Sequence, residues 1–297
     1  MKKLLSNILP ETVKEYYKKN KRKIKSKKRE LLKENNQITT QEDVEAMLLK
    51  IGIKTGDVLM LHSSLSQIGY VEGSAQTLIN AILKVIGHSG TMVMPAFPAK
   101  GFNYDYLKSK PVFDLLNTPS NSGIITETFR KMKGVKRSLH PTDSVCAIGK
   151  KSELITGSHF NQITPYNKMS PFYKLIELHA KIILLGVDLT VLTNLHTLED
   201  AIANFKFPVY HSTIFDCVLI NEKKQKVTVK TKCHDPRWSK KRKCNELLPL
   251  FETAGVLKKS KLGNAQVFLL DANKMFDCML KNYNEKGITM YTPQGSI

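Results

Sequence analysis

The segment from Lys181 to Asn204, KIILLGVDLTVLTNLHTLEDAIAN, constrains the possible folds of this chain most strongly. Its aliphatic run predicts a buried strand over residues 181–187, with Gly186 near its end. A short polar turn follows, and a helix is predicted over residues 193–205. Because open α/β sheets bind ligands just beyond the carboxyl ends of their strands, this turn is a candidate place for chemistry.

The predicted helix carries His196 and Glu199, three residues apart. Side chains at that spacing lie on one face of a helix, so Glu199 can orient the imidazole of His196 and hold it as a proton acceptor. The alternative is an ordinary polar pair on a surface helix, and this segment alone does not exclude it.

Strand and helix patterns alternate along the rest of the chain, which predicts an α/β fold with a mixed, partly parallel sheet flanked by helices. Thr39 is expected to cap the first helix, which runs through Ile51, with Glu42 completing a capping box. The other expected strands cover residues 58–61, 91–95, 145–148, 212–220, 227–233 and 265–270. The other expected helices cover residues 74–85, 123–132, 171–179, 245–254 and 272–282.

The net charge of +20 is unevenly spread: residues 1–40 hold 13 Lys and Arg against four Glu, and the rest of the chain also carries an excess of positive charge. Such charge favours polyanionic partners. No apolar run is long enough to span a bilayer and no signal-peptide pattern is present, so a cytoplasmic protein is expected. The five cysteines show no CxxC spacing, which argues against a zinc site or a disulfide framework.

The chain divides into a basic N-terminal extension, residues 1–38, and a predicted globular domain, residues 39–297. Apolar residues near a helical period alternate with lysines over residues 1–35, which predicts a basic amphipathic helix able to lie on an anionic membrane surface. The protein would then sit at the inner face of the membrane. A solvated basic extension is the alternative.

Two polar segments follow or precede predicted strands. The first, His62-Ser63-Ser64-Leu65, leads into a loop and a helix, and its hydroxyl and backbone N–H groups suit an anionic or amide-rich ligand, although neither a P-loop nor a GxGxxG motif is present. A capped turn is the alternative. The second, RSLHPTDSV, gathers several polar side chains in a loop before a strand: Arg137, Ser138, His140 and Thr142.

Six motifs in chain order resemble the antibiotic N-acetyltransferase family, which includes the aminoglycoside 3-N-acetyltransferases: HSSLSQIG, GTMVMPAF, FDLLNTPSNSGIITETFR, RSLHPTDSVCAIG, TPYNKMSPFYKL and LLGVDLTVLTNLHTLED. The resemblance covers residues 42 to 285. It implies a fold unlike that of the GNAT acetyltransferases and acetyl-CoA as co-substrate, without a metal. It also implies direct attack of an acceptor amine on the thioester.

The resemblance places the general base on His196, with Glu199 steering it and His140 lining the same cleft. It implies that His62, Ser63, Ser64 and Leu65 meet the pantetheine side of coenzyme A. Residues near the pyrophosphate or thioester would be Arg137, Ser138 and Thr142. Ser64 is the candidate donor to the negatively charged oxygen of the tetrahedral stage.

The acceptor is predicted from a departure from the family pattern. Residues 240–243 are all basic, which would repel a polycationic aminoglycoside and attract an acidic acceptor. We therefore expect an amino sugar in a sugar nucleotide or a glycan precursor for the cell envelope, with an aminoglycoside as the alternative. The oligomeric state stays open, with a dimer among the options.

A non-catalytic binding protein is a further alternative, in which the positive charge serves nucleic acid or lipid. RNA binding needs aromatic stacking platforms among basic residues, and Trp238 is the best candidate for one that the body of the chain offers. We therefore expect no nucleic-acid partner.

Overall fold

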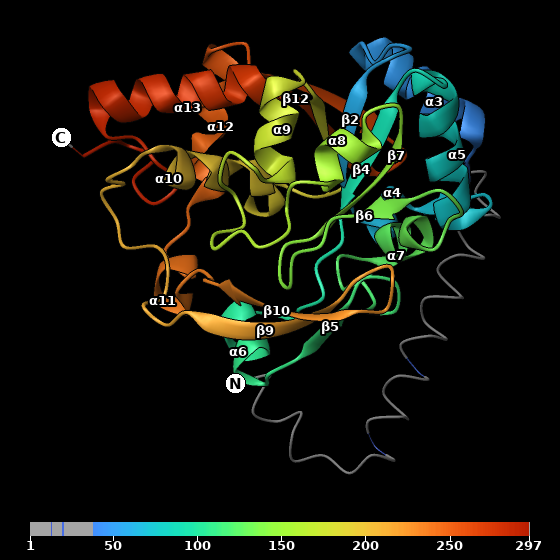
Figure 1. The fold of residues 1–297 in the computed structure, drawn as a ribbon. Coiled ribbons are helices and arrows are strands. Elements are labelled where there is room, and N and C mark those ends of the chain that lie inside the picture. Colours follow the sequence, from blue (N-terminus) through green and yellow to red (C-terminus); the bar gives the residue numbers. More distant parts are fainter. Residues whose placement is uncertain (1–12, 14–19, 21–37, 297) are drawn as a thin grey trace.

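The computed structural model describes residues 38–296 together with Val13 and Asn20 (Figure 1). The predicted amphipathic helix and its membrane contact therefore lie outside the described residues, apart from those two positions and Ile38. Within the described part of the chain, no helix is both long and apolar enough to cross a bilayer.

The centre of the molecule is a seven-stranded mixed sheet, which confirms the predicted fold class. Three strands at its middle are parallel: β2 (Val58–Ser63), β4 (Thr91–Pro95) and β8 (Lys181–Leu185). The antiparallel strands lie outside them, with β12 (Ala265–Asp271) and β11 (Leu257–Leu262) beyond β8, and β7 (Val145–Gly149) and β6 (Lys136–Arg137) beyond β4.

Side chains of the central strands alternate between two apolar cores because successive residues of a strand point to opposite faces. Leu59 and Leu61 pack with the first group of helices, and Met60 packs with the second. The first group contains α3 (Gln41–Ile51), α5 (Ser74–Ile86) and α7 (Ile124–Arg130). The second contains α8 (Ser152–Thr156), α9 (Pro171–Glu177), α12 (Leu248–Thr253) and α13 (Ala272–Lys286).

A separate three-stranded sheet lies below the main body in Figure 1 and has its own small core. It consists of β5 (Val112–Asp114), β9 (Phe215–Ile220) and β10 (Lys226–Thr231), with α6 (Asn103–Lys108) packed beside it. The remaining short elements are β1 (Ile38–Thr39), β3 (Tyr70–Val71), α4 (Leu65–Ile68), α11 (Pro236–Ser239) and the 3-10 helices η1 (Leu189–Val191), η2 (Thr193–His196) and η3 (Cys244–Leu247).

Two of the predicted helices differ from the structure, one in its capping residues and one in its extent. The cap of α3 is Thr40 and not Thr39, and Asp43 rather than Glu42 completes the capping box. The helix expected over residues 193–205 is η2 followed by the short helix α10 (Thr197–Ala201). The backbone N–H and the hydroxyl of Thr197 both donate to the carbonyl of Asn194, the hydroxyl at 2.7 Å, and the backbone is extended again at Ile202.

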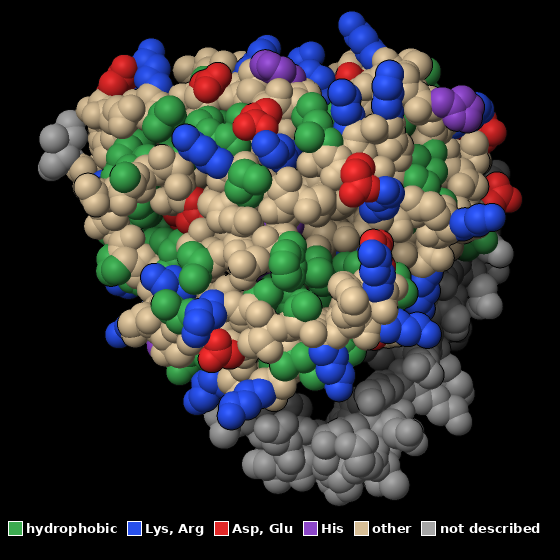
Figure 2. All heavy atoms as spheres, viewed as in Figure 1, with side chains coloured by type: hydrophobic (Ala, Val, Ile, Leu, Met, Phe, Trp, Pro, Cys, Tyr) green, Lys and Arg blue, Asp and Glu red, His purple; other side chains and the backbone are tan. Residues whose placement is uncertain are grey.

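The surface viewed from the same side carries Lys and Arg side chains over most of its extent, with fewer Asp and Glu among them (Figure 2). The body of the chain is therefore basic as well as its N-terminal extension, in line with the net charge of +20.

Candidate active site

Two adjoining hollows lie at the carboxyl ends of the parallel strands. The first, here called the dyad cavity, has a volume of about 520 Å³ and is lined by side chains that include His62, Asp143, Tyr166, His196, His234 and Arg242. The second, here called the serine groove, has a volume of about 1260 Å³ and is lined by residues that include Ser64, Leu65, Ser66, Ser74, Gly123 and Ile124. Ser63, Asn121 and Ser122 line both, so the hollows share a wall.

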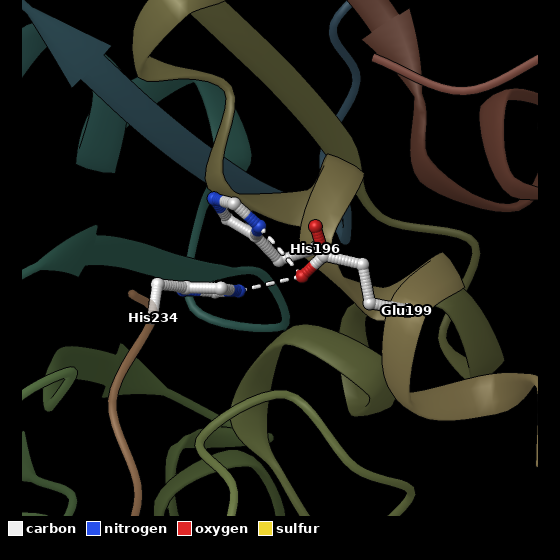
Figure 3. A group of neighbouring side chains, drawn as sticks. All are labelled: His196, Glu199 and His234. Atoms are coloured by element: carbon white, nitrogen blue, oxygen red, sulfur yellow. Dashed lines mark hydrogen bonds and ion pairs between the residues drawn. The ribbon is translucent and has the colours of Figure 1, made fainter. Parts of the chain in front are cut away.

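The predicted pair of His196 and Glu199 is buried beside the dyad cavity (Figure 3). Nδ1 of His196 lies 3.0 Å from Oε2 of Glu199. Because an ionised carboxylate only accepts hydrogen bonds, Nδ1 carries the proton and Nε2 keeps its lone pair. Nε2 has no hydrogen-bond partner within residues 38–296 and belongs to a residue of the cavity wall. The arrangement can therefore accept a proton from a molecule in the cavity.

A third side chain, His234, was missed by the sequence analysis. Its Nε2–H donates to the same Glu199 oxygen at 2.6 Å, and the hydroxyl of Tyr291 donates to the other oxygen at 2.6 Å (Figure 3 shows the two imidazoles and the carboxylate). His234 follows β10 and is fixed by a backbone bridge to Tyr210. No local periodicity marks it, since its partner lies 35 residues away in the chain.

Burial and hydrogen bonding set the charges of this group. Burial lowers the pKa of His196 to about 3, against the opposing attraction of Glu199, so the imidazole is neutral. Burial alone would raise the pKa of Glu199, but attraction and hydrogen bonds from the two imidazoles hold it well below its usual range. The group therefore consists of an ionised carboxylate between two N–H donors.

Tyr166 supports both imidazoles from one side. Its ring stacks on His196 with centroids 4.8 Å apart and on His234 with centroids 5.5 Å apart. The Tyr166 hydroxyl donates to Asp143 at 2.9 Å, and the backbone N–H of Tyr166 donates to Asp200 at 3.1 Å. The imidazoles are thus held in place by packing as well as by Glu199.

Three of the four residues of the basic run over residues 240–243 do not line the dyad cavity. Arg242 alone of these four residues lines it, near Glu199 and Tyr291. Two carboxylates, Asp143 and Glu199, lie in or directly beside the same cavity. The predicted repulsion of a cationic acceptor therefore loses its main support.

The four residues of the HSSL segment lie around the two hollows. His62 lines the dyad cavity and is buried, and its Nε2 has no hydrogen-bond partner among the residues that the structure describes. Ser63 lies on the shared wall, while Ser64 and Leu65 line the serine groove. Their contact with coenzyme A stays a prediction.

The loop RSLHPTDSV turns inward, and its predicted site residues line neither hollow. Arg137 donates to the backbone carbonyls of Thr118 and Ala96. Ser138 and Thr142 are fully buried, and the His140 ring stacks on His159 with centroids 4.4 Å apart. The placement of Arg137, Ser138, His140 and Thr142 thus does not support the predicted contacts. Their side chains brace the loop that presents Asp143, because they bond to one another and to neighbouring groups of the interior.

The stability of the protein should fall below pH 6.5. Burial lowers the pKa of His62 and of His140 to about 4 and that of His196 to about 3, whereas a histidine in the unfolded chain titrates near 6.5. Between those values the unfolded state binds more protons, so each group removes up to about 1.4 kcal/mol of stability per pH unit. Urea unfolding from pH 7.5 to pH 4.5 measures this, and His62→Gln should flatten the slope. An unfolding midpoint independent of pH would contradict the expectation.

The ligand atoms of His196, Glu199 and His234 lie within 4.8 Å of one another, which is close enough to hold a metal ion. The hydrogen bonds described above already satisfy the carboxylate and one nitrogen of each ring. The donor set does not require a metal, and its absence from the reaction stays a prediction.

Comparisons by family model, by sequence and by structure point to the same group of proteins. The family model for aminoglycoside 3-N-acetyltransferases matches residues 60–284. Aminoglycoside N(3)-acetyltransferase IX of Micromonospora chalcea is 31% identical over 182 residues, which cover 57% of this chain and 64% of that protein. The prophage-derived aminoglycoside N(3')-acetyltransferase-like protein YokD of Bacillus subtilis is 33% identical over 176 residues, covering 54% and 64%. The aligned part thus spans slightly less than two thirds of these relatives.

Solved structures share the fold over most of their length. The crystal structure of YokD is 28% identical, with a TM-score of 0.70, and the match covers 84% of this chain and 96% of that one. Aminoglycoside acetyltransferase AAC(3)-Xa has a TM-score of 0.72 at 23% identity, covering 88% and 98%. A third neighbour, AAC-IIIb, was solved with CoASH, and it has a TM-score of 0.68 at 22% identity, covering 82% and 96%.

Proposed function

Because this chain belongs to the aminoglycoside 3-N-acetyltransferase family, we propose that it transfers an acetyl group from acetyl-CoA to an amine of an aminoglycoside-type amino sugar. The observation that carries the proposal is the buried pair of His196 and Glu199, because His196 lines the dyad cavity and its Nε2 keeps a lone pair. The named acceptors of the relatives favour an aminoglycoside over the sugar nucleotide or glycan precursor that the basic run suggested.

The two hollows suit the two substrates. The serine groove is the larger one and offers hydroxyls and backbone groups, so we place coenzyme A there, with its thioester at the shared wall near Ser63. The acceptor would enter the dyad cavity, where Asp143 can attract an ammonium group. Proteins of the same fold have been solved with CoASH and with sisomicin, which agrees with a coenzyme and an aminoglycoside as the two ligands.

The reaction would proceed by direct attack of the amine nitrogen on the thioester carbonyl carbon. Nε2 of His196 accepts a proton from that nitrogen as the N–C bond forms, and Glu199 stabilises the resulting imidazolium. The carbonyl oxygen gains negative charge at this stage, and the Ser64 hydroxyl, on the wall of the serine groove, is our candidate donor to it. The C–S bond then breaks and the thiolate takes up a proton.

Release of the coenzyme A thiol tests this proposal. Purified protein is mixed with acetyl-CoA and gentamicin, sisomicin, glucosamine or a glucosamine sugar nucleotide, with and without EDTA. We expect thiol release and an acetylated product with an aminoglycoside, unchanged by EDTA. Turnover of the sugar nucleotide alone would overturn the acceptor assignment, and absence of turnover with all acceptors would overturn the enzymatic one.

We also propose that the N-terminal extension, residues 1–38, attaches the protein to anionic membranes. The support is its sequence, in which lysines alternate with apolar residues. The full chain should sediment with vesicles that contain phosphatidylserine, and a variant without residues 1–38 should not, while its soluble turnover is retained. Equal binding of the full chain to neutral phosphatidylcholine vesicles would contradict the proposal.

A further inference from the structure

The carboxylate of Glu199 accepts hydrogen bonds on both of its oxygens. His196 donates through Nδ1 and His234 through Nε2, both to Oε2, and Figure 3 shows the two dashed lines ending on that one oxygen. The other oxygen, Oε1, accepts from the hydroxyl of Tyr291 at 2.6 Å. Among the residues that the structure describes, Tyr291 is thus the hydrogen-bond donor to Oε1.

The two imidazoles alone do not fix the orientation of this carboxylate. The last torsion of a glutamate side chain is broad and has no sharp staggered minima. A carboxylate held only at Oε2 can therefore tilt about that oxygen, and the imidazole of His196 turns with its acceptor. A second bond at Oε1 removes this freedom. The side chain of Glu199 is 0% exposed, so bulk water does not reach it to replace such a bond.

Tyr291 is itself held firmly in place. Its ring packs edge-on against Phe207 and Trp238, with centroids 5.8 and 5.5 Å away. Its backbone N–H donates to the hydroxyl of Thr289 at 3.0 Å. Burial raises the pKa of the Tyr291 hydroxyl, so this group stays a neutral donor. The bond to Oε1 therefore comes from a side chain that has little room to move.

The segment that carries Tyr291 also forms part of the dyad cavity. The preceding residue, Met290, lines the cavity, and its carbonyl accepts from the backbone N–H of Lys243 at 2.7 Å. Both Met290 and Tyr291 are buried. They follow α13 and lie outside residues 60–284, which the family model matches. The family match therefore assigns no role to either residue.

The orientation of Glu199 matters most when His196 takes up a proton. The ring then becomes an imidazolium, and its Nδ1–H bond to Oε2 joins two opposite charges, which makes the bond stronger. We propose that Tyr291 is a positioning residue for this step: its hydroxyl fixes the carboxylate of Glu199 and, through it, the imidazole of His196. This inference rests on the proposed function.

A Tyr291→Phe variant tests the proposal, because it removes the hydroxyl and keeps the ring. With gentamicin and acetyl-CoA, kcat should fall by about tenfold while both KM values stay unchanged, since the hydroxyl acts on alignment and not on substrate binding. Tyr283→Phe is the matched control: its hydroxyl accepts from the backbone N–H of Lys206 at 3.3 Å, and it lines neither hollow. The control should keep the native kcat, and both variants should keep a thermal midpoint close to the native one.

A double-mutant cycle separates positioning from a general effect on the fold. If Tyr291 acts through the carboxylate, its hydroxyl has nothing left to position once Glu199→Gln is present. The double variant should then have the kcat of Glu199→Gln alone, within about twofold. Losses that multiply would show that Tyr291 acts elsewhere, and a native kcat in Tyr291→Phe would show that Oε1 needs no donor. Either result overturns the proposal.

The Nδ1 proton of His196 gives a second measurement, which needs no turnover. In proton–nitrogen NMR spectra at neutral pH, its signal should broaden through faster exchange with water in Tyr291→Phe and stay sharp in Tyr283→Phe. An unchanged signal in Tyr291→Phe, when the native protein acetylates gentamicin, defeats this inference alone. A broadened signal in that variant, when the native protein acetylates no acceptor, defeats the proposed function alone.

Discussion

Replacement of His196 by alanine is expected to lower kcat for acetyl transfer by about 10²–10⁴-fold. Glu199 orients the imidazole of His196 through Nδ1, so that the lone pair of Nε2 can accept the proton. Alanine removes this lone pair without adding another base. His234 would stay bonded to Glu199. Steady-state kinetics with saturating acetyl-CoA and gentamicin give the value.

The fold should survive this change. His196 lies on a cavity wall, so water can fill the vacated space, and the main packing interaction that alanine removes is the stacking on Tyr166. A thermal midpoint close to that of the native protein serves as the control. Full turnover by the alanine variant with a good acceptor would refute the base assignment and, with it, the interpretation of this cavity as the reaction centre.

Replacement of Glu199 has the second large expected effect, and two variants separate its charge from its shape. Glu199→Gln keeps a carbonyl oxygen for the imidazole donors but removes the negative charge that stabilises a protonated ring. We expect kcat to fall by about 10²-fold or more with little loss of stability. Kinetics and urea unfolding of the same preparation measure both quantities.

Glu199→Leu should differ because it removes the acceptor altogether. The carboxylate is bonded to His196, His234 and Tyr291, so three donors would be left in a buried place. An unsatisfied buried polar group costs about 1–3 kcal/mol, and stability should therefore fall by several times the loss seen in the glutamine variant. Equal stability of the two variants would show that water or another residue takes over the hydrogen bonds of Glu199.

The sequence predicts the local parts of this architecture well because they depend on neighbouring residues. The strand over Thr91–Pro95 has the expected bounds, and the apolar run before Gly186 forms a central strand. The pairing of His196 with Glu199 was also accessible, since three residues separate them. Periodicity alone carries such information.

The distant parts of the site could not be predicted in the same way. Tyr291 and Glu199 are 92 residues apart, and only the folded sheet brings them together. β11 was also missed, because its lysines interrupt the apolar pattern at the edge of the sheet. The loop around His140 shows the same limit: its polar residues look like a site in the sequence, whereas the fold places them in the interior, bonded to one another and to their neighbours.

The shared wall between the two hollows bears on the order of events in catalysis. Ser63, Asn121 and Ser122 separate spaces that open beside one another, so neither substrate has to leave before the other arrives. Initial rates measured at several fixed concentrations of acetyl-CoA should therefore give double-reciprocal lines that intersect. Parallel lines would mean that a protein side chain carries the acyl group between two half-reactions.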